Sequence, residues 1–354
     1  MTDSRLINTW KRFFKNRGLN ELNSSLYLDY IQKLHSQNLP VIFETEHLSL
    51  LFGRTKPYLN SVAFSPRSHY RTFKIKKKSG GFRDIDVPFP ALLECQYWIY
   101  ENILSKIQLN YCAHGFVKKK SIITNAKIHL NQAELLKIDL KDFFPSISKE
   151  RVISMFYNFG YPPDLSFYLG SFCCLEDCLP QGAPTSPAIS NIIAKNLDNR
   201  ILAFVKKFDL KYTRYADDLA ISGKRIPTKF IDYLDKIIEE EAFEMNPLKT
   251  QLYKKQGKRI LTGVSIGTNK LRAPKEYKRK LFQEIHYIYK FGLNSHMLKK
   301  KIRNPYYLNT LFGKLNYVLN IEPDNIKAQE YKKLLVLKKG NNKSGITSED
   351  LLWY

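Results

Sequence analysis

Two adjacent acidic residues in the second half of the chain have the surroundings of a metal site. Asp217 and Asp218 end the motif Tyr215-Ala216-Asp217-Asp218, and both flanks of this motif are rich in aromatic, β-branched and apolar residues. The pattern predicts two short antiparallel strands that meet at a tight turn with both carboxylates at its tip. Burying two like charges without a partner costs several kcal/mol, which a divalent cation relieves. Hard oxygen ligands of this kind are those that Mg²⁺ prefers.

A third carboxylate, Asp139, lies in the mostly apolar segment over residues 135–140. This segment predicts a buried strand that ends in Asp139. Pro145 follows and stops that strand. An Asp-Asp pair by itself is most often a solvated turn, so a chemical role depends on Asp139 joining Asp217 and Asp218. Carboxylates from a strand and a neighbouring hairpin can hold two metal ions roughly 4 Å apart, which is the arrangement for in-line phosphoryl transfer.

A basic hairpin is predicted upstream of these carboxylates. Residues 70–76 alternate in polarity like a strand, residues 77–81 have the composition of a turn, and residues 82–88 read as the returning strand. Lys76 and Arg83 would then lie near the tip, where cations can neutralise the charge that develops on a triphosphate. The alternative is an exposed basic hairpin that contacts nucleic acid without specificity.

The composition predicts a folded protein with a polyanionic partner. The chain has 354 residues, of which 44% are hydrophobic, and this length allows two or three subdomains. Lys and Arg number 57 against 33 Asp and Glu, which gives a net charge of +24. Such an excess favours nucleic acid over a merely soluble basic surface, with an affinity that falls steeply as salt is added.

The sequence carries no sign of export or membrane insertion. No apolar run approaches the ~20 residues of a membrane span, and residues 1–18 lack the apolar core of a secretory signal. The five Cys residues show no disulfide pattern, which fits a reducing cytoplasm. Cys173, Cys174 and Cys178 could be metal ligands, but their segment is apolar and buried core residues are the favoured interpretation. We therefore expect a cytoplasmic protein without a membrane partner.

Three motifs, in their order and spacing, resemble the palm of a reverse transcriptase. They are the strand ending in Asp139 with Phe143-Phe144-Pro145-Ser146 after it, Leu179-Pro180-Gln181-Gly182 with the helix that follows, and Tyr215-Ala216-Asp217-Asp218. Within that group the chain resembles bacterial retron reverse transcriptases, because Asn125-Ala126-Lys127-Ile128-His129 matches their Asn-Ala-x-x-His signature. Leu261-Thr262-Gly263 resembles their Val-Thr-Gly signature, with Leu in place of Val. The resemblance covers about residues 50–320.

The resemblance implies an α+β fold of the right-hand polymerase type, in which fingers, palm and thumb surround a small antiparallel palm sheet. The expected divisions are an N-terminal helical extension over residues 1–50, fingers over 51–137, palm over 138–268, thumb over 269–320, and a C-terminal helix and tail over 321–354. Residues 179–207 are expected to form a helix region between fingers and palm, with one helix from about residue 187 to 207, and residues 114–121 resemble a fingers strand.

The resemblance also implies roles for single residues. Asp139, Asp217 and Asp218 would be catalytic, and two Mg²⁺ ions would be bound at Asp139, Leu140, Asp217 and Asp218. The implied nucleotide-binding residues are Lys76, Arg83, Asp142, Phe143, Phe144, Gln181 and Lys249. Among these, Phe144 matches a bulky gate against the 2′-hydroxyl, and Lys249 matches a proton donor to pyrophosphate. Asp142 and Phe143 would offer backbone N–H groups to the triphosphate.

A second implied set would bind RNA or the primer: Asn125, His129, Leu261, Thr262, Gly263, Lys275, Lys278 and Arg279. A lone Asn or His on a helix is usually structural, and only the resemblance suggests that Asn125 and His129 recognise the enzyme's own RNA. Residues 259–266 read as a hairpin that would grip the primer end, and residues 274–291 as a basic amphipathic helix that suits an A-form duplex.

An enzyme of this type would be an RNA-directed DNA polymerase of a retron. It would bind a cognate structured noncoding RNA as template and primer, begin from a 2′-hydroxyl of that RNA, and use deoxynucleoside triphosphates. Its product would be multicopy single-stranded DNA (msDNA), a branched RNA–DNA molecule. Because retrons generally act in antiphage defence, a separate effector protein would be a further partner.

Two other functions remain open from the sequence. The first is a group II intron-like or other bacterial reverse transcriptase, although the chain ends soon after the expected thumb and leaves no room for a maturase or endonuclease domain. The second is a non-catalytic RNA-binding scaffold on a polymerase fold. It is disfavoured because Asp139, Asp217 and Asp218 are all present.

Overall fold

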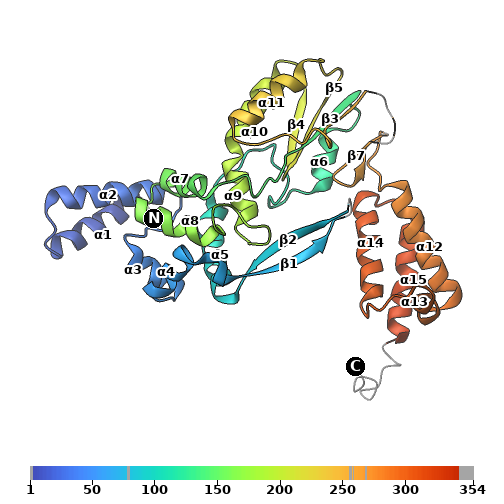
Figure 1. Cartoon of the computed structure of the whole chain (residues 1–354), viewed down its shortest axis with the longest axis horizontal. Coiled ribbons are helices and arrows are strands. Elements are labelled where there is room, and N and C mark those ends of the chain that lie inside the picture. Colours follow the sequence, from blue (N-terminus) through green and yellow to red (C-terminus); the bar gives the residue numbers. More distant parts are fainter. Residues whose placement is uncertain (1–2, 78–79, 255–256, 258, 268, 343–354) are drawn as a thin grey trace.

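The computed structural model describes residues 3–77, 80–254, 257, 259–267 and 269–342 (Figure 1). Its helices and small antiparallel sheets confirm the predicted α+β fold. The N-terminal helices lie at one end of the long axis and the C-terminal helices at the other, with the largest sheet between them (Figure 1). In the described part, no helix is both long and apolar enough to cross a membrane.

The N-terminal region is helical, as predicted for residues 1–50. Its helices are α1 (Asp3–Asn16), α2 (Glu21–Ser36), α3 (Thr45–Phe52) and α4 (Lys56–Phe64). Helix α2 begins after Asn20, whose side chain accepts a hydrogen bond from the Asn23 N–H and so satisfies one free donor of the first turn. Phe14, Leu28 and Ile31 form a small core between α1 and α2.

The predicted basic hairpin is present. After the 3-10 turn η1 (Pro66–His69), strand β1 (Tyr70–Lys76) pairs antiparallel with β2 (Phe82–Pro88), from Tyr70 opposite Pro88 to Lys76 opposite Phe82. Residues 78 and 79 of the predicted turn lie outside the described residues. Almost every residue of β1 is exposed, so this hairpin stands clear of the core.

The next segment is mostly helical: α5 (Pro90–Asn102), η2 (Leu104–Lys106), α6 (Ile122–Ile128), α7 (Lys149–Phe159) and α8 (Pro163–Cys173). The strand expected over residues 114–121 is wrong. Those residues form turns, because Phe116 and Lys119 have positive φ angles of 59° and 64°, which an extended strand does not allow. Within the segment, Cys173 and Cys174 are buried, as predicted, whereas Cys178 is half-buried.

A four-stranded antiparallel sheet occupies the centre, with the order β4 (Lys211–Tyr215), β5 (Asp218–Gly223), β3 (Glu134–Asp139) and β6 (Gln251–Tyr253). The two inner strands, β5 and β3, consist mainly of buried residues, as expected for strands covered on both faces. The predicted boundary between residues 137 and 138 falls inside β3, so it divides a strand that belongs wholly to this sheet.

Helices α9 (Ser186–Ile193) and α10 (Lys195–Lys206) lie between β3 and β4 in the chain, and α11 (Phe230–Glu240) lies between β5 and β6. All three contribute buried residues to the main core. One helix was expected over about residues 187–207, and the structure has two. They meet at Ala194, where ψ is 0° instead of the roughly −42° of an α-helix, and this single residue turns the chain from α9 into α10. Helix α10 packs against β4, as does α6.

The C-terminal elements form a second core. A short hairpin, β7 (Ile260–Leu261) and β8 (Val264–Ser265), leads into α12 (Lys275–Phe291), α13 (Leu293–Lys300), α14 (Tyr307–Ile321) and α15 (Ile326–Asn342). We refer to α12–α15 as the C-terminal bundle. The predicted hairpin over 259–266 and the predicted helix over 274–291 are both confirmed, whereas the tail over 343–354 lies outside the described residues.

Candidate active site

The turn between β4 and β5 carries Asp217 and Asp218. Tyr215 pairs with Asp218 at the end of the ladder, which leaves Ala216 and Asp217 as the two turn residues. Ala216 has a φ of +57°, in the left-handed region that residues with a side chain rarely adopt. The surroundings hold it there, since Arg214 Nη1 donates a hydrogen bond to the Ala216 carbonyl over 3.3 Å. The predicted hairpin with carboxylates at its tip is therefore present.

Strand β3 brings Asp139 to the same place. In the antiparallel register of β3 with β5, Asp139 lies opposite Asp218. The N–H of Leu140 donates a hydrogen bond of 2.9 Å to the carbonyl of Asp217, which ties the end of β3 to the turn. Three carboxylates separated by up to 79 positions in the sequence (139 to 218) thus meet at one end of the central sheet.

The cluster carries unbalanced negative charge. Burial raises the pKa of Asp218 to about 6, and the charges of Asp217 and Asp139 add to this effect. Burial also raises the pKa of Asp217, with Asp139 contributing. Lys249 Nζ bonds to Asp139 Oδ1 at 2.7 Å, and this bond raises the lysine pKa. Asn246 Nδ2 donates to the same oxygen at 3.3 Å.

This donor set suits a hard divalent cation. All ligand atoms on offer are oxygens, and a cation would offset the burial and the mutual repulsion that raise the pKa values of Asp217 and Asp218. Leu140 has a buried apolar side chain and could contribute only its carbonyl oxygen. Among the described residues, however, no three His, Cys, Asp or Glu side chains already stand in a metal-binding arrangement.

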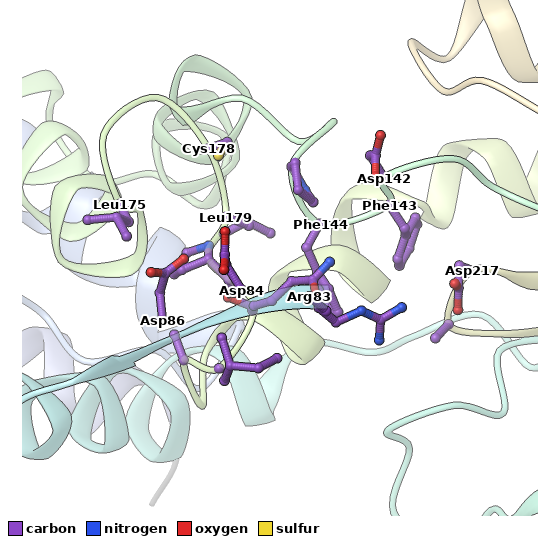
Figure 2. A pocket seen from close by; sticks show the side chains of 18 of the residues that line it. Arg83, Asp84, Asp86, Asp142, Phe143, Phe144, Leu175, Cys178, Leu179 and Asp217 are labelled. Carbon is purple, nitrogen blue, oxygen red and sulfur yellow. Dashed lines mark hydrogen bonds between the residues drawn. The ribbon is translucent and has the colours of Figure 1, made fainter. Parts of the chain in front are cut away.

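A cleft of about 1230 Å³ opens beside the cluster. Its lining includes Asp139 and Asp217, but not Asp218, together with every residue predicted to bind the nucleotide: Lys76, Arg83, Asp142, Phe143, Phe144, Gln181 and Lys249. In Figure 2, Arg83 extends from β2 toward Asp217. The cleft therefore has a cationic wall from the basic hairpin facing an acidic one from the sheet.

The loop after β3 forms part of this lining. Asp142 has a φ of +43° and is exposed, and its carbonyl accepts a hydrogen bond of 2.8 Å from the Ser146 N–H. Phe143 is buried against Phe243, with ring centroids 5.6 Å apart. Its ring is therefore mainly a core group, and the role of its backbone N–H toward a triphosphate stays a prediction.

The basic hairpin and the loop of Gln181 are joined by their backbones. The N–H of Asp86 donates to the Gln181 carbonyl at 2.7 Å. Gly182 has a φ of +136°, and a Cβ there would lie only 2.5 Å from the Asp86 carbonyl oxygen. Only glycine fits this position, because a side chain would force the hairpin and the loop apart.

Comparisons with known proteins agree with this geometry. The family model "Reverse transcriptase (RNA-dependent DNA polymerase)" matches residues 75–266. The chain is 33% identical over 272 residues to the Retron Ec86 reverse transcriptase of Escherichia coli, with 76% of this chain and 85% of that protein covered. This chain belongs to the retron reverse transcriptases. It is therefore an RNA-directed DNA polymerase, and its reverse transcriptase domain implies a divalent metal cofactor.

Further relatives extend the same result. The Retron Ec73 reverse transcriptase of Escherichia coli is 31% identical over 287 residues, covering 76% of this chain and 88% of that protein. The Retron Mx162 reverse transcriptase of Myxococcus xanthus is 30% identical over 294 residues, covering 72% of this chain and 61% of that protein. Each matches most of this retron reverse transcriptase.

Two residues predicted to recognise RNA are buried inside this retron reverse transcriptase. His129 is 1% exposed, and its ring nitrogens are hydrogen-bonded to the hydroxyls of Ser222 at 2.6 Å and Thr213 at 2.7 Å. Asn125 accepts a bond of 2.5 Å from Thr213 and donates one of 3.3 Å to Thr262 Oγ1. Burial lowers the pKa of His129 to about 3, so its ring is neutral. Both side chains are bonded within the protein, to the strands β4 and β5 and to the β7–β8 turn, and their role in RNA recognition stays a prediction.

The remaining residues predicted to bind RNA or primer are divided between surface and interior. Gly263, Lys275 and Arg279 are exposed, Thr262 is half-buried and Leu261 is buried. The Gly263 carbonyl accepts a hydrogen bond of 2.7 Å from Tyr317 in α14, which connects the β7–β8 turn to the C-terminal bundle. Lys278 is engaged within the protein, because its Nζ lies 2.7 Å from Glu322.

Sequence reasoning missed a buried ion pair behind the catalytic turn. Arg214 and Asp198 are both fully buried, and the guanidinium donates to the two carboxylate oxygens at 2.8 and 2.7 Å. Arg214 also donates to Asn191 Oδ1 at 2.9 Å, and Tyr212 donates to Asp198 at 2.8 Å. The signal that could have revealed this network is an arginine inside a strand that leads to the acidic turn, because a buried charge needs a partner.

Proposed function

We propose that this retron reverse transcriptase makes DNA by two-metal nucleotidyl transfer at the cluster of Asp139, Asp217 and Asp218. The supporting observation is the register of β3 with β5, in which Asp139 lies opposite Asp218, at the turn that carries Asp217 and beside a cleft with a cationic wall. The three side chains, with the Leu140 carbonyl, would hold two Mg²⁺ ions. When bound, these ions would neutralise charge on the attacking and leaving oxygens of an in-line displacement.

The protein's own residues would bind and orient the nucleotide. Arg83 and Lys76 would pair with the β- and γ-phosphates, and exposed backbone at Asp142 would donate hydrogen bonds to them. Gln181 would contact the incoming nucleotide or the template base. Lys249 carries its proton at Nζ beside Asp139, where it can donate that proton to the leaving pyrophosphate.

We further propose that the nucleic acid is a cognate structured noncoding RNA that serves as template and primer. The net charge of +24 and the exposed Lys275 and Arg279 on α12 support a broad phosphate-binding surface. Synthesis would begin at a 2′-hydroxyl of this RNA and produce branched msDNA. As part of an antiphage defence system, the enzyme and its product would act with a separate effector protein.

The test is expression of the chain with its flanking noncoding RNA, followed by isolation of nucleic acid. Native protein should yield a branched RNA–DNA molecule, and Asp217→Asn should abolish it. Asp232→Asn is the matched control, since Asp232 is exposed on α11 and does not line the cleft. Product that persists at native levels in Asp217→Asn would contradict the proposed centre.

A further inference from the structure

Phe116 follows a segment that is bound along the catalytic hairpin. The N–H of Arg214 donates to the Cys112 carbonyl at 2.9 Å, and the N–H of His114 donates to the Arg214 carbonyl at 2.7 Å. Asn191 Nδ2 donates to the Gly115 carbonyl at 2.8 Å. These bonds fix the backbone that immediately precedes Phe116.

The approach to the catalytic turn is as close as backbones allow. A Cβ on Gly115 would lie 2.5 Å from the nitrogen of Ala216, so position 115 must remain glycine. Phe116 is therefore held next to the turn that carries Asp217. Its side chain lines the same cleft as Asp217 and Phe144.

The conformation of Phe116 is unfavourable for its residue type. Its φ is +59°, a left-handed value that is rare and strained for an aromatic residue. The side chain is 52% exposed, so burial offsets only part of this strain. Strain in an exposed aromatic at a cleft points to a functional role and away from a role in core packing.

The ring of Phe116 also contacts the residue implied as the sugar gate. Its centroid lies 6.3 Å from that of Phe144 at an interplanar angle of 43°, within the range of interacting aromatic pairs. On another side, Phe144 contacts the buried ring of Phe143 at 5.6 Å. Phe144 therefore has a fixed neighbour in the core and a second neighbour in the cleft.

We propose that Phe116 is a specificity-determining residue that, with Phe144, forms a two-ring wall selecting deoxynucleotides over ribonucleotides. This inference rests on the proposed role of Phe144. A half-buried ring that stands alone can rotate away from a 2′-hydroxyl, whereas a ring supported from the cleft side cannot. Phe116 supplies that support from a backbone anchored to the catalytic turn.

The experiment measures single-nucleotide incorporation by purified enzyme on its RNA, with a deoxynucleotide or the matching ribonucleotide. Phe116→Ala should lower the deoxy-to-ribo ratio of kcat/KM by about tenfold, mainly because the ribonucleotide is used better. The double variant with Phe144→Ala should lose no more discrimination than Phe144→Ala alone, because the two rings act as one unit. Tyr111→Ala is the control, since Tyr111 is more exposed and does not line the cleft.

A second variant separates specificity from folding. Asn tolerates positive φ, so Phe116→Asn should unfold at the native temperature or above it and still lose discrimination. The inference is contradicted if Phe116→Ala keeps the deoxy-to-ribo ratio of kcat/KM within twofold of native. It is also contradicted if the double variant loses as much discrimination as the product of the two single effects. If Phe144→Ala itself leaves the ratio unchanged, the sugar gate is wrong and this inference falls with it. A native chain that incorporates no nucleotide would instead contradict the proposed function.

Discussion

The two hairpins that border the cleft are built in opposite ways. In the acidic hairpin, β4–β5, most residues are buried and the arginine inside it is fully paired. In the basic hairpin, β1–β2, most residues are exposed, and Lys76 and Arg83 stand in solvent. Carboxylates that share a metal need fixed positions and low hydration, whereas cations that receive a mobile triphosphate can stay hydrated until it arrives.

Their attachments to the rest of the molecule differ in the same way. The acidic hairpin is joined to α6 by His129, to α10 by Asp198 and to β3 by its full register. The basic hairpin meets the Gln181 loop through the backbone bond from Asp86 to Gln181 and the close approach at Gly182. Changes in the acidic hairpin should therefore act on both stability and activity, and changes in the basic hairpin on activity alone.

The largest effect is expected from Arg214→Met. The substitution leaves the Asp198 carboxylate buried without its positively charged partner, although the Tyr212 hydroxyl still donates to it. Breaking a buried ion pair in this way destabilises a protein by about 3–5 kcal/mol. Thermal unfolding should occur at a clearly lower temperature, and DNA synthesis should be lost. Calorimetry and primer extension measure the two effects. Restoring much of the unfolding temperature by adding Asp198→Leu would confirm the cause, and a native unfolding temperature in the single variant would contradict it.

Arg83→Ala is expected to show the opposite pattern. Because Arg83 is exposed on β2, the unfolding temperature should stay within about 1 °C of native. The kcat/KM for deoxynucleotides should fall about 10- to 100-fold, since a cation near the triphosphate is removed. Lys74→Ala is the control, because Lys74 is exposed on β1 and does not line the cleft. Equal losses in Arg83→Ala and Lys74→Ala would contradict a specific role for Arg83 in the cleft, and an unfolding temperature well below native in Arg83→Ala would contradict the contrast with the acidic hairpin.

His129→Ala should lower stability moderately and slow synthesis without weakening RNA binding. Two buried hydroxyls, on Thr213 and Ser222, would lose their imidazole partner, at about 1–3 kcal/mol for each group left unsatisfied. Lys127→Ala is the comparison, since Lys127 is exposed on α6, the helix that His129 follows. Filter binding at fixed salt measures the RNA affinity of both variants. A large loss of affinity in His129→Ala, with native stability, would support direct recognition of RNA by His129.

The smallest effect concerns pH. Burial raises the pKa of Asp218 to about 6 in the folded protein, above its ordinary value of 3.8. The folded state therefore binds more protons, and the contribution of Asp218 to stability falls as pH rises between these values. In chelator at pH 7.5, Asp218→Asn should unfold about 2–4 °C above native, and this gain should shrink toward pH 4. Added Mg²⁺ should stabilise the native protein more than the variant. A gain that is independent of pH would contradict this explanation.

Much of the fold could be predicted from patterns of neighbouring residues in the sequence. The alternation of residues 70–76, the turn residues of 77–81 and the acidic tip of residues 215–218 specified both hairpins correctly. They could do so because strands and tight turns depend mainly on neighbouring residues. The break at Ala194 and the turns over 114–121 were missed, because they depend on the backbone angles of one residue and of two residues, respectively, which composition does not signal.

By itself the sequence determined the α+β class, the two hairpins, the cluster of Asp139, Asp217 and Asp218, and the enzyme family. Only the tertiary structure decided that His129 is an internal connector and that Arg214 has a buried partner. The physical reason is separation along the chain: His129 bonds to residues 84 and 93 positions away, and such partners exist only once the fold has brought them together. Whether a polar side chain faces solvent or the interior follows from those distant contacts and not from its neighbours in sequence.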